Sequence, residues 1–264
     1  MSQELQSMPE VAINQRSNLS REAVLRAADV INVEDVSPHE RFEGAYWVKF
    51  QDNSRRLATK NLSPGHSVYG EQLVKLRQKE YRLWDAYRSK LAAAILKGVK
   101  EVSISPGRRA LYLGAASGTT ASHVSDILGD EGLVYCVEFA QRTMRELIDH
   151  VCSERSNLSP ILADARHPSA YRSLVSPVDT IYCDIAQPEQ ARILADNSDL
   201  FLKKSGTVML AVKSRSVDVT MSPATVFTQE KRTLVQRGFE IIDTVRLEPY
   251  EKDHAMVVAK RESQ

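Results

Sequence analysis

The chain has 264 residues, 42% of them hydrophobic, and its 35 Lys and Arg residues nearly balance its 34 Asp and Glu residues, leaving a formal net charge of +1. These values predict a globular protein with room for one large and one small domain, and they argue against a protein that binds nucleic acid through bulk charge alone. Because the first residues lack a signal-peptide pattern and no segment approaches the roughly 18 apolar residues of a membrane span, we expect a cytoplasmic protein with no membrane partner.

The first 80 residues divide into two segments. Residues 1–40 are mostly polar and form an extension, in which the stretch SREAVLRAADVI predicts one short helix with an N-cap at Ser20. Residues 41–80 show short alternating segments separated by the turn signals DN and PG, which predict a small β-rich domain.

Residues 71–110, which overlap the end of this domain, carry ten Lys and Arg residues against four acids. This excess of positive charge fits a solvated helix face and a phosphate-contacting patch equally well.

Residues 81–264 alternate strands with helices. The predicted strands are ALYLG, GLVYCVEF, LSPILAD, VDTIYCDIA and GTVMLAVKS, each followed by a helical pattern. This order predicts an α/β domain with a parallel sheet covered by helices on both faces. The end of the chain differs, because the strands FEIIDTVRLEPY and HAMVVAKR are separated only by EKD. They form a hairpin, so the last strand runs antiparallel.

The turn after the first of these strands contains Gly114 and Gly118 with only Ala-Ala-Ser between them. It is not the GxGxxG pattern of dinucleotide sites, and no lysine follows to hold a phosphate. In a parallel sheet, ligands bind beyond the carboxyl ends of the strands. The strands predicted here end in Glu138-Phe139, Asp164-Ala165, Asp184 and Lys213. Three acids and one lysine are therefore expected at one edge.

The spacing of these residues favours S-adenosylmethionine as the ligand. Glu138 lies 20 residues after Gly118, which is the usual position of an acid that binds ribose hydroxyls. Phe139 is placed to cover an adenine face, and Asp164 to accept a hydrogen bond from the exocyclic amine. The short glycine turn suits a ligand without phosphates, and the terminal hairpin is typical of the common methyltransferase fold. Carboxylates that only cap helices are the structural alternative.

The three cysteines, Cys136, Cys152 and Cys183, are scattered and lack the spacing of a metal site. We therefore expect free thiols, two of them in buried strands, and no bound metal.

Several sequence blocks resemble the fibrillarin family, the RNA 2′-O-methyltransferases of box C/D guide ribonucleoproteins. They are LYLGAASGTTASHVSDILGDEGLVYCVEF, DARHP, CDIAQPEQ, AVKSRSVDVT and LEPYEKDHA. The resemblance covers about Gly44 to Lys260. It implies a Rossmann-like, class I S-adenosylmethionine-dependent methyltransferase domain with a terminal antiparallel hairpin and a small N-terminal β domain. The Gly/Arg-rich tail of nucleolar members is absent from a chain with only 11 glycines, so the archaeal form is the better match.

The resemblance also implies site residues. The catalytic residues would be Lys90, Asp184, Lys213 and His254, of which His254 rests on the resemblance alone. The residues predicted to contact the cofactor are Gly114, Ala115, Thr119, Thr120, Glu138, Phe139, Asp164, Ala165, Asp184, Ile185, Ala186 and Gln187.

The implied reaction is methylation of a ribose 2′-hydroxyl in pre-rRNA or tRNA. Two lysines in one cleft repel each other, and burial disfavours their charged form, so we expect one of them to act as a general base. We assign that role to Lys213 and expect Asp184 to orient it. The alternative is that these groups only hold the ribose in line for attack, which alone can lower a barrier by ~7–11 kcal/mol. Methylation of a protein glutamine side chain on the same fold also stays open.

The resemblance further implies three partners: a Nop-domain scaffold protein, a kink-turn-binding protein of ribosomal type, and a box C/D guide RNA with its target rRNA or tRNA. We expect the small N-terminal domain to help dock the scaffold. Tyr46, Trp47 and Tyr69 are available as anchors there, although a core position for two of the three is the simpler expectation.

Overall fold

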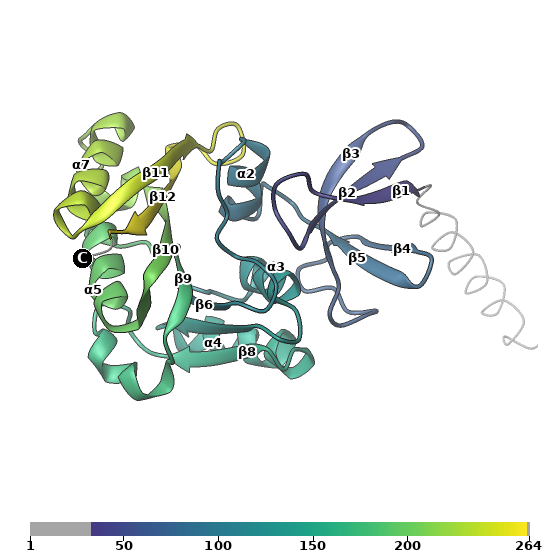
Figure 1. Ribbon diagram of the computed structural model, residues 1–264, viewed down its shortest axis with the longest axis horizontal. Helices are drawn as coiled ribbons and strands as arrows, with labels where there is room; N and C mark the ends of the chain where they lie inside the picture. Colours follow the sequence, from purple (N-terminus) through teal and green to yellow (C-terminus); the bar gives the residue numbers. More distant parts are fainter. Residues whose placement is uncertain (1–32, 263–264) are drawn as a thin grey trace, which may run out of the picture.

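Two β-sheets lie next to each other in the computed structural model, which describes residues 33–262 (Figure 1). The smaller sheet is antiparallel and has the order β1-β2-β3-β5-β4. Its strands are β1 (Val33–Pro38), β2 (Ala45–Phe50), β3 (Arg55–Lys60), β4 (Leu73–Leu76) and β5 (Lys79–Leu83). The sheet thus begins before residue 41, where the sequence places the start of this domain. The helix predicted after Ser20 lies outside the described residues.

The larger sheet has seven strands in the order β11-β12-β10-β9-β6-β7-β8. They are β6 (Arg109–Leu113), β7 (Leu133–Glu138), β8 (Leu158–Leu162), β9 (Val178–Cys183), β10 (Leu202–Lys213), β11 (Phe239–Arg246) and β12 (His254–Arg261). Strands β6 to β10 pair in parallel, and β12 runs antiparallel to both β10 and β11. The predicted α/β fold with a terminal hairpin is confirmed. However, β11 is shorter than the sequence pattern suggested, and the connecting turn takes residues 247–253.

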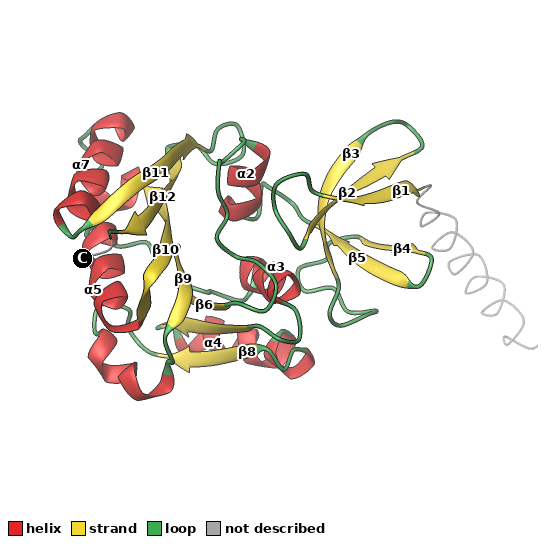
Figure 2. Ribbon diagram, viewed as in Figure 1, coloured by secondary structure: helices red, strands yellow, loops and turns green. Residues whose placement is uncertain are grey.

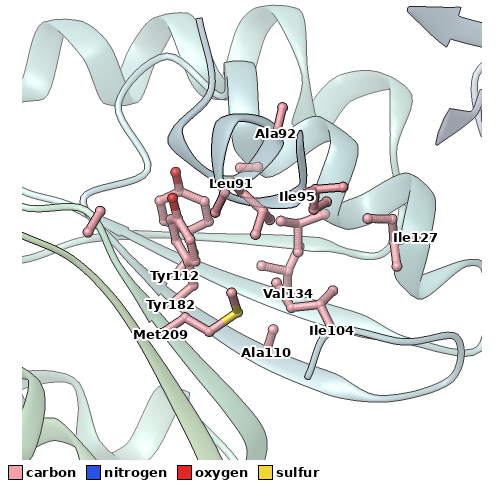
Figure 3. Packing of buried hydrophobic residues seen from close by; sticks show 14 of the residues in the cluster. Leu91, Ala92, Ile95, Ile104, Ala110, Tyr112, Ile127, Val134, Tyr182 and Met209 are labelled. Atoms are coloured by element: carbon pink, nitrogen blue, oxygen red, sulfur yellow. The ribbon is translucent and has the colours of Figure 1, made fainter. Parts of the chain in front are cut away.

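Helices cover both faces of the large sheet (Figure 2). They are α2 (Lys90–Leu96), α3 (Thr119–Leu128), α4 (Gln141–His150), α5 (Gln190–Phe201), α6 (Ser214–Val217) and α7 (Pro223–Gln236), with short 3₁₀ turns at Cys152–Glu154 and Pro168–Leu174. Side chains of α2, α3 and α4 form one core cluster with the sheet, and those of α5 and α7 form a second cluster on the other face. In Figure 3, Leu91 and Ile95 of α2 pack over Tyr112, Val134 and Met209.

The cysteines are free thiols, as predicted. Cys136 and Cys183 are buried in the sheet, and Cys152 is half-buried. Burial raises the pKa of Cys152 to about 11. Among residues 33–262, no helix is both long enough and apolar enough to span a membrane.

A buried network of charges joins the small sheet to α3. Arg82 on β5 has no exposed surface, and its Nη1 lies 2.8 Å from Asp126 Oδ2 on α3. Its second partner is the Glu71 carboxylate, 2.5 Å away, while Arg155 Nη1 lies 2.6 Å from Asp126 Oδ1. Burial of these charges costs free energy unless each keeps its partner. The small sheet is therefore held in a defined position against the helix that follows the glycine turn.

Candidate active site

A cavity of about 260 Å³ opens at the carboxyl ends of the parallel strands, where the sequence predicted a ligand. Nine of the twelve predicted cofactor contacts line it. The lining consists of Gly114, Ala116, Val137, Glu138, Phe139, Ala163, Asp164, Ala165, Arg166, Asp184, Ile185, Ala186, Gln187 and Lys213. A small, mostly apolar cavity with a few polar groups is the usual form of a cofactor site.

The glycine turn is pressed against the backbone that follows β9. Gly114 has a φ of +82°, and a Cβ built on it would lie 2.8 Å from the carbonyl oxygen of Asp184 and 3.0 Å from Ile185 Cγ2. Only glycine fits both the left-handed conformation and the close approach. The next left-handed residue is Ala116, with a φ of 47°, and its backbone N–H donates to Glu138 Oε2 at 2.9 Å. The turn therefore forms one wall of the cavity.

Three predicted cofactor contacts do not line the cavity: Ala115, Thr119 and Thr120. Ala115 is buried in the core cluster below the turn, and Thr119 is half-buried at the start of α3. The hydroxyl of Thr120 donates to Ser89 Oγ at 3.0 Å, and Ser89 is the N-cap of α2. In this structure Thr120 joins α3 to α2. The helical rotation of α3 explains the difference from the sequence prediction, because residues after the turn leave the cavity wall.

The ribose acid predicted from the spacing, Glu138, is 7% exposed and lies at the end of β7. Its two oxygens accept backbone N–H groups from Ala116 and Ala140, both at 2.9 Å. Each oxygen keeps a further lone pair, because a carboxylate has about four acceptor sites. Phe139 follows with 65% of its surface exposed at the cavity, which leaves a ring face open to a flat ligand.

Asp164 is bound by a residue that the sequence analysis did not single out. Arg166 also lines the cavity, and its Nη2 donates to Asp164 Oδ2 at 2.6 Å. Hydrogen bonds from the Arg166 side chain hold the pKa of Asp164 below its ordinary value. The cavity thus carries a charged carboxylate at the end of β8, beside the strand that ends in Glu138. Arg166 belongs to the DARHP block quoted for the family resemblance, but nothing in the sequence assigned it a contact with Asp164.

Three of the four predicted catalytic residues contact one another. Lys213 Nζ lies 2.9 Å from Asp184 Oδ1 and also donates to the Asp184 backbone carbonyl at 2.9 Å. Lys90 Nζ, at the first residue of α2, lies 3.4 Å from the same Oδ1. Lys90 Nζ also donates to Asp184 Oδ2 at 3.5 Å. The Asp184 carboxylate therefore lies between the two lysine side chains.

The fourth predicted residue, His254, is the first residue of β12 and pairs in register with Lys213. It reaches the cluster through Glu251, which the sequence analysis did not identify. Glu251 Oε1 lies 3.7 Å from Lys90 Nζ, and Glu251 Oε2 lies 3.9 Å from His254 Nδ1.

Gln190 at the start of α5 is a further residue that the sequence analysis missed. It is fully buried, donates to the Ile185 carbonyl at 2.5 Å, and accepts the backbone N–H of Lys213 at 3.0 Å. One side chain thus holds the loop after β9 against the end of β10. Its signal was weak, since a polar residue at a helix start is usually exposed.

Parallel strands with a terminal antiparallel hairpin, joined to a cavity with three carboxylates and a glycine turn, define the fold of S-adenosylmethionine-dependent methyltransferases. The family model that matches the chain is Fibrillarin, over residues 36–263. The chain belongs to the fibrillarin family.

Three relatives show the extent of the similarity. A fibrillarin-like rRNA/tRNA 2′-O-methyltransferase of Pyrobaculum islandicum is 56% identical, over 88% of this chain and 99% of that protein. The crystal structure of Aeropyrum pernix fibrillarin with natively bound S-adenosyl-L-methionine is 52% identical, has a TM-score of 0.82, and covers 87% of this chain and 100% of its own. Fibrillarin in a fibrillarin/Nop5p complex is 43% identical with a TM-score of 0.72, covering 78% and 94% of the two chains.

Proposed function

We propose that this chain transfers the methyl group of S-adenosylmethionine to a ribose 2′-hydroxyl of rRNA or tRNA. The observation that carries the proposal is the Lys90, Asp184 and Lys213 cluster at the cavity. Lys213 and Asp184 line that cavity, and Lys90 contacts Asp184 at its edge. A hydroxyl bound there meets the Lys90 ammonium group where negative charge develops as its proton leaves. The Pyrobaculum relative, named for this reaction, is 56% identical.

The residues of the cavity fit S-adenosylmethionine. Glu138 has lone pairs for ribose hydroxyls, Asp164 is a charged acceptor for an exocyclic amine, and Phe139 offers an exposed ring for adenine. Gly114 leaves room where any side chain would meet the Asp184 carbonyl. The cofactor supplies an electrophilic methyl group on a sulfonium centre. The Aeropyrum fibrillarin, which holds this cofactor natively, is 52% identical to the chain.

We assign the roles within the cluster as follows. Asp184, whose Oδ1 lies 2.9 Å from Lys213 Nζ, orients the Lys213 side chain toward the ribose hydroxyl. Lys213, anchored by the Asp184 carbonyl and by Gln190 through its backbone N–H, takes the hydroxyl proton as the general base from its uncharged amine form. Lys90 stabilises the developing oxyanion. In the alternative, all three groups only hold the ribose in line for attack.

We further propose that methylation takes place within an assembly with a Nop-domain scaffold protein, a kink-turn-binding protein and a box C/D guide RNA. Contacts to phosphates alone bind weakly, at about 10⁻⁴–10⁻⁶ M, and carry no base information, so another component must select the nucleotide. The relative in the fibrillarin/Nop5p complex supports the scaffold partner.

The aromatic anchors suggested for scaffold docking are partly engaged within the chain. The Tyr69 hydroxyl lies 2.8 Å from His123 Nε2, and Tyr46 packs on the core of the small sheet. Trp47 is half-buried, with the Arg55 guanidinium 4.7 Å above its ring. Of these three residues, Trp47 is the best remaining candidate for a scaffold contact.

The test is a methylation assay with labelled cofactor on a guide-matched RNA, with each component omitted in turn. We expect methylation of the 2′-hydroxyl opposite the guide only in the complete mixture. Guide-matched turnover by the isolated chain at a comparable rate would contradict the need for an assembly. A glutamine-containing protein substrate is included, because its methylation in place of RNA would favour the alternative methyltransferase activity.

A further inference from the structure

Glu251 lies at the edge of the proposed catalytic cluster, in the turn between β11 and β12. We propose that it is a positioning residue for methyl transfer, which holds Lys90 and His254 in a fixed relation to each other. The proposal rests on the proposed function of the site. Glu251 does not line the cofactor cavity, so its contribution is separable from cofactor binding.

The turn that carries Glu251 is anchored at several points. The Glu251 backbone N–H donates to the Leu247 carbonyl at 3.2 Å, and Leu247 itself is fully buried. Farther along the turn, the Asp253 carbonyl accepts both the backbone N–H of Ser214 at 3.2 Å and its hydroxyl at 3.0 Å. Ser214 directly follows Lys213. The turn is therefore tied to the end of β10 and presents Glu251 from a defined position.

The two oxygens of the Glu251 carboxylate face different groups, the Lys90 ammonium and the His254 ring. Oε1 lies 3.7 Å from Lys90 Nζ, and Oε2 lies 3.9 Å from His254 Nδ1, with 27% of the Glu251 side chain exposed. His254 Nδ1 also lies 2.6 Å from the Lys252 carbonyl. Because a carbonyl can only accept, Nδ1 carries the proton. The negative charge of Glu251 beside that N–H favours the same tautomer and leaves Nε2 as the acceptor of the neutral ring.

Glu251 also makes the two lysines unequal. Lys90 lies between two carboxylates, those of Asp184 and Glu251, whereas Lys213 has ion-pair contact with Asp184 only among the described residues. Without the second carboxylate, Lys90 would have one anionic partner and would compete with Lys213 for it. Glu251 thus draws Lys90 to one side of Asp184 and leaves Lys213 its closer contact. This geometry affects the rate of methyl transfer and not the affinity for the RNA substrate.

The experiment compares Glu251→Gln and Glu251→Asp with the wild-type chain in the complete guide assembly under single-turnover conditions. We expect Glu251→Gln to lower the rate by about 10- to 100-fold, the loss typical of misplaced reacting groups, with unchanged KM for RNA and unchanged cofactor affinity. Glu251→Asp retains the charge and should recover part of the rate. Glu240→Gln, an exposed glutamate on β11 of the same hairpin, serves as the matched control and should match the wild type.

Two further measurements decide the mechanism of the loss. In a Lys90→Ala background, Glu251→Gln should cost less than in the wild type, because residues that act through one another are not additive. NMR of the His254 ring nitrogens should show more of the neutral ring protonated at Nε2 in Glu251→Gln, since the negative charge beside the Nδ1–H is removed. A fully active Glu251→Gln variant, an additive double variant or an unchanged His254 tautomer would each overturn the proposal. A wild-type assembly that does not methylate RNA would instead contradict the proposed function, while the tautomer measurement would still test the Glu251 contact.

Discussion

Gly114→Ala should damage the site because the added methyl group would clash with the backbone that follows β9. The added Cβ would lie 2.8 Å from the Asp184 carbonyl oxygen, so that oxygen must withdraw by about 0.6 Å to reach the 3.4 Å of ordinary van der Waals contact. The same carbonyl accepts the hydrogen bond from Lys213 Nζ at 2.9 Å. Ile185 Cγ2, 3.0 Å from the added carbon, lines the cofactor cavity and must move as well. One methyl group therefore perturbs cofactor binding and catalysis together.

The size of the effect follows from two separate costs. A side chain in the left-handed region costs roughly 1–2 kcal/mol in any environment. Overpacking against fixed backbone adds about 1–3 kcal/mol. Gly107→Ala is the matched control, because Gly107 has a φ of +75°, lies at the other end of β6, and has nothing within 4 Å of its added Cβ. We expect Gly107→Ala to lose only the first amount of unfolding free energy and Gly114→Ala to lose both.

The assays are urea unfolding, calorimetric titration with S-adenosylmethionine, and methyl transfer in the complete assembly. Gly107→Ala should bind the cofactor and turn over as the wild type does. Gly114→Ala should bind it at least about 10-fold more weakly, and a shift approaching 1 Å in the reacting groups can lower the rate about 100-fold. Equal losses in the two variants would show that backbone strain, and not the contact with Asp184, controls the turn, and the steric argument would then fail.

Three further outcomes are expected. Glu138→Ala should weaken cofactor binding by about 1.5–3 kcal/mol, or about 10- to 150-fold by calorimetry, and unchanged affinity in a folded variant would refute its role. Asp184→Ala and Lys213→Ala should each abolish most methyl transfer without disrupting assembly, and a double variant that lost the product of both effects would indicate independent roles. Burial, and then Arg82 and Arg155, hold the pKa of His123 well below 6.5. The unfolded chain therefore binds the proton first, and stability should fall by up to about 1.4 kcal/mol per pH unit between pH 6.5 and 5, with a smaller slope for His123→Gln in urea unfolding.

The architecture of the large sheet could be predicted because its signals are local. Each buried strand is a continuous apolar run, and the residues that end these strands, Glu138, Asp164, Asp184 and Lys213, meet at one edge in the structure. Strand β1 has no such signal. Its sequence, VEDVSP, reads as polar because it is an edge strand with largely exposed side chains, and only its pairing with β2 defines it.

The residues that the sequence analysis missed are those whose neighbours come from distant parts of the chain. Glu251 belongs to a turn with ordinary turn residues near the end of the chain. Its partner Lys90 lies on α2, far earlier in the sequence. Gln190 likewise reaches Lys213 only because α5 packs beside β10. The basic stretch of residues 71–110 was misleading in a similar way. A solvated helix face and a phosphate-contacting patch both require exposed side chains. Arg82 is instead fully buried against the carboxylates of Glu71 and Asp126.

That buried network connects the small sheet to the reacting groups through a short series of contacts. Asp126, held by Arg82 of the small sheet, lies on the same helix as Thr120. Thr120 in turn bonds to Ser89, the N-cap of the helix that begins with Lys90. A displacement of the small sheet would leave buried charges unpaired, which typically costs about 3–5 kcal/mol. A scaffold bound to that sheet would thus hold a rigid body that includes the glycine turn and Lys90, and could orient both toward an RNA target without touching either.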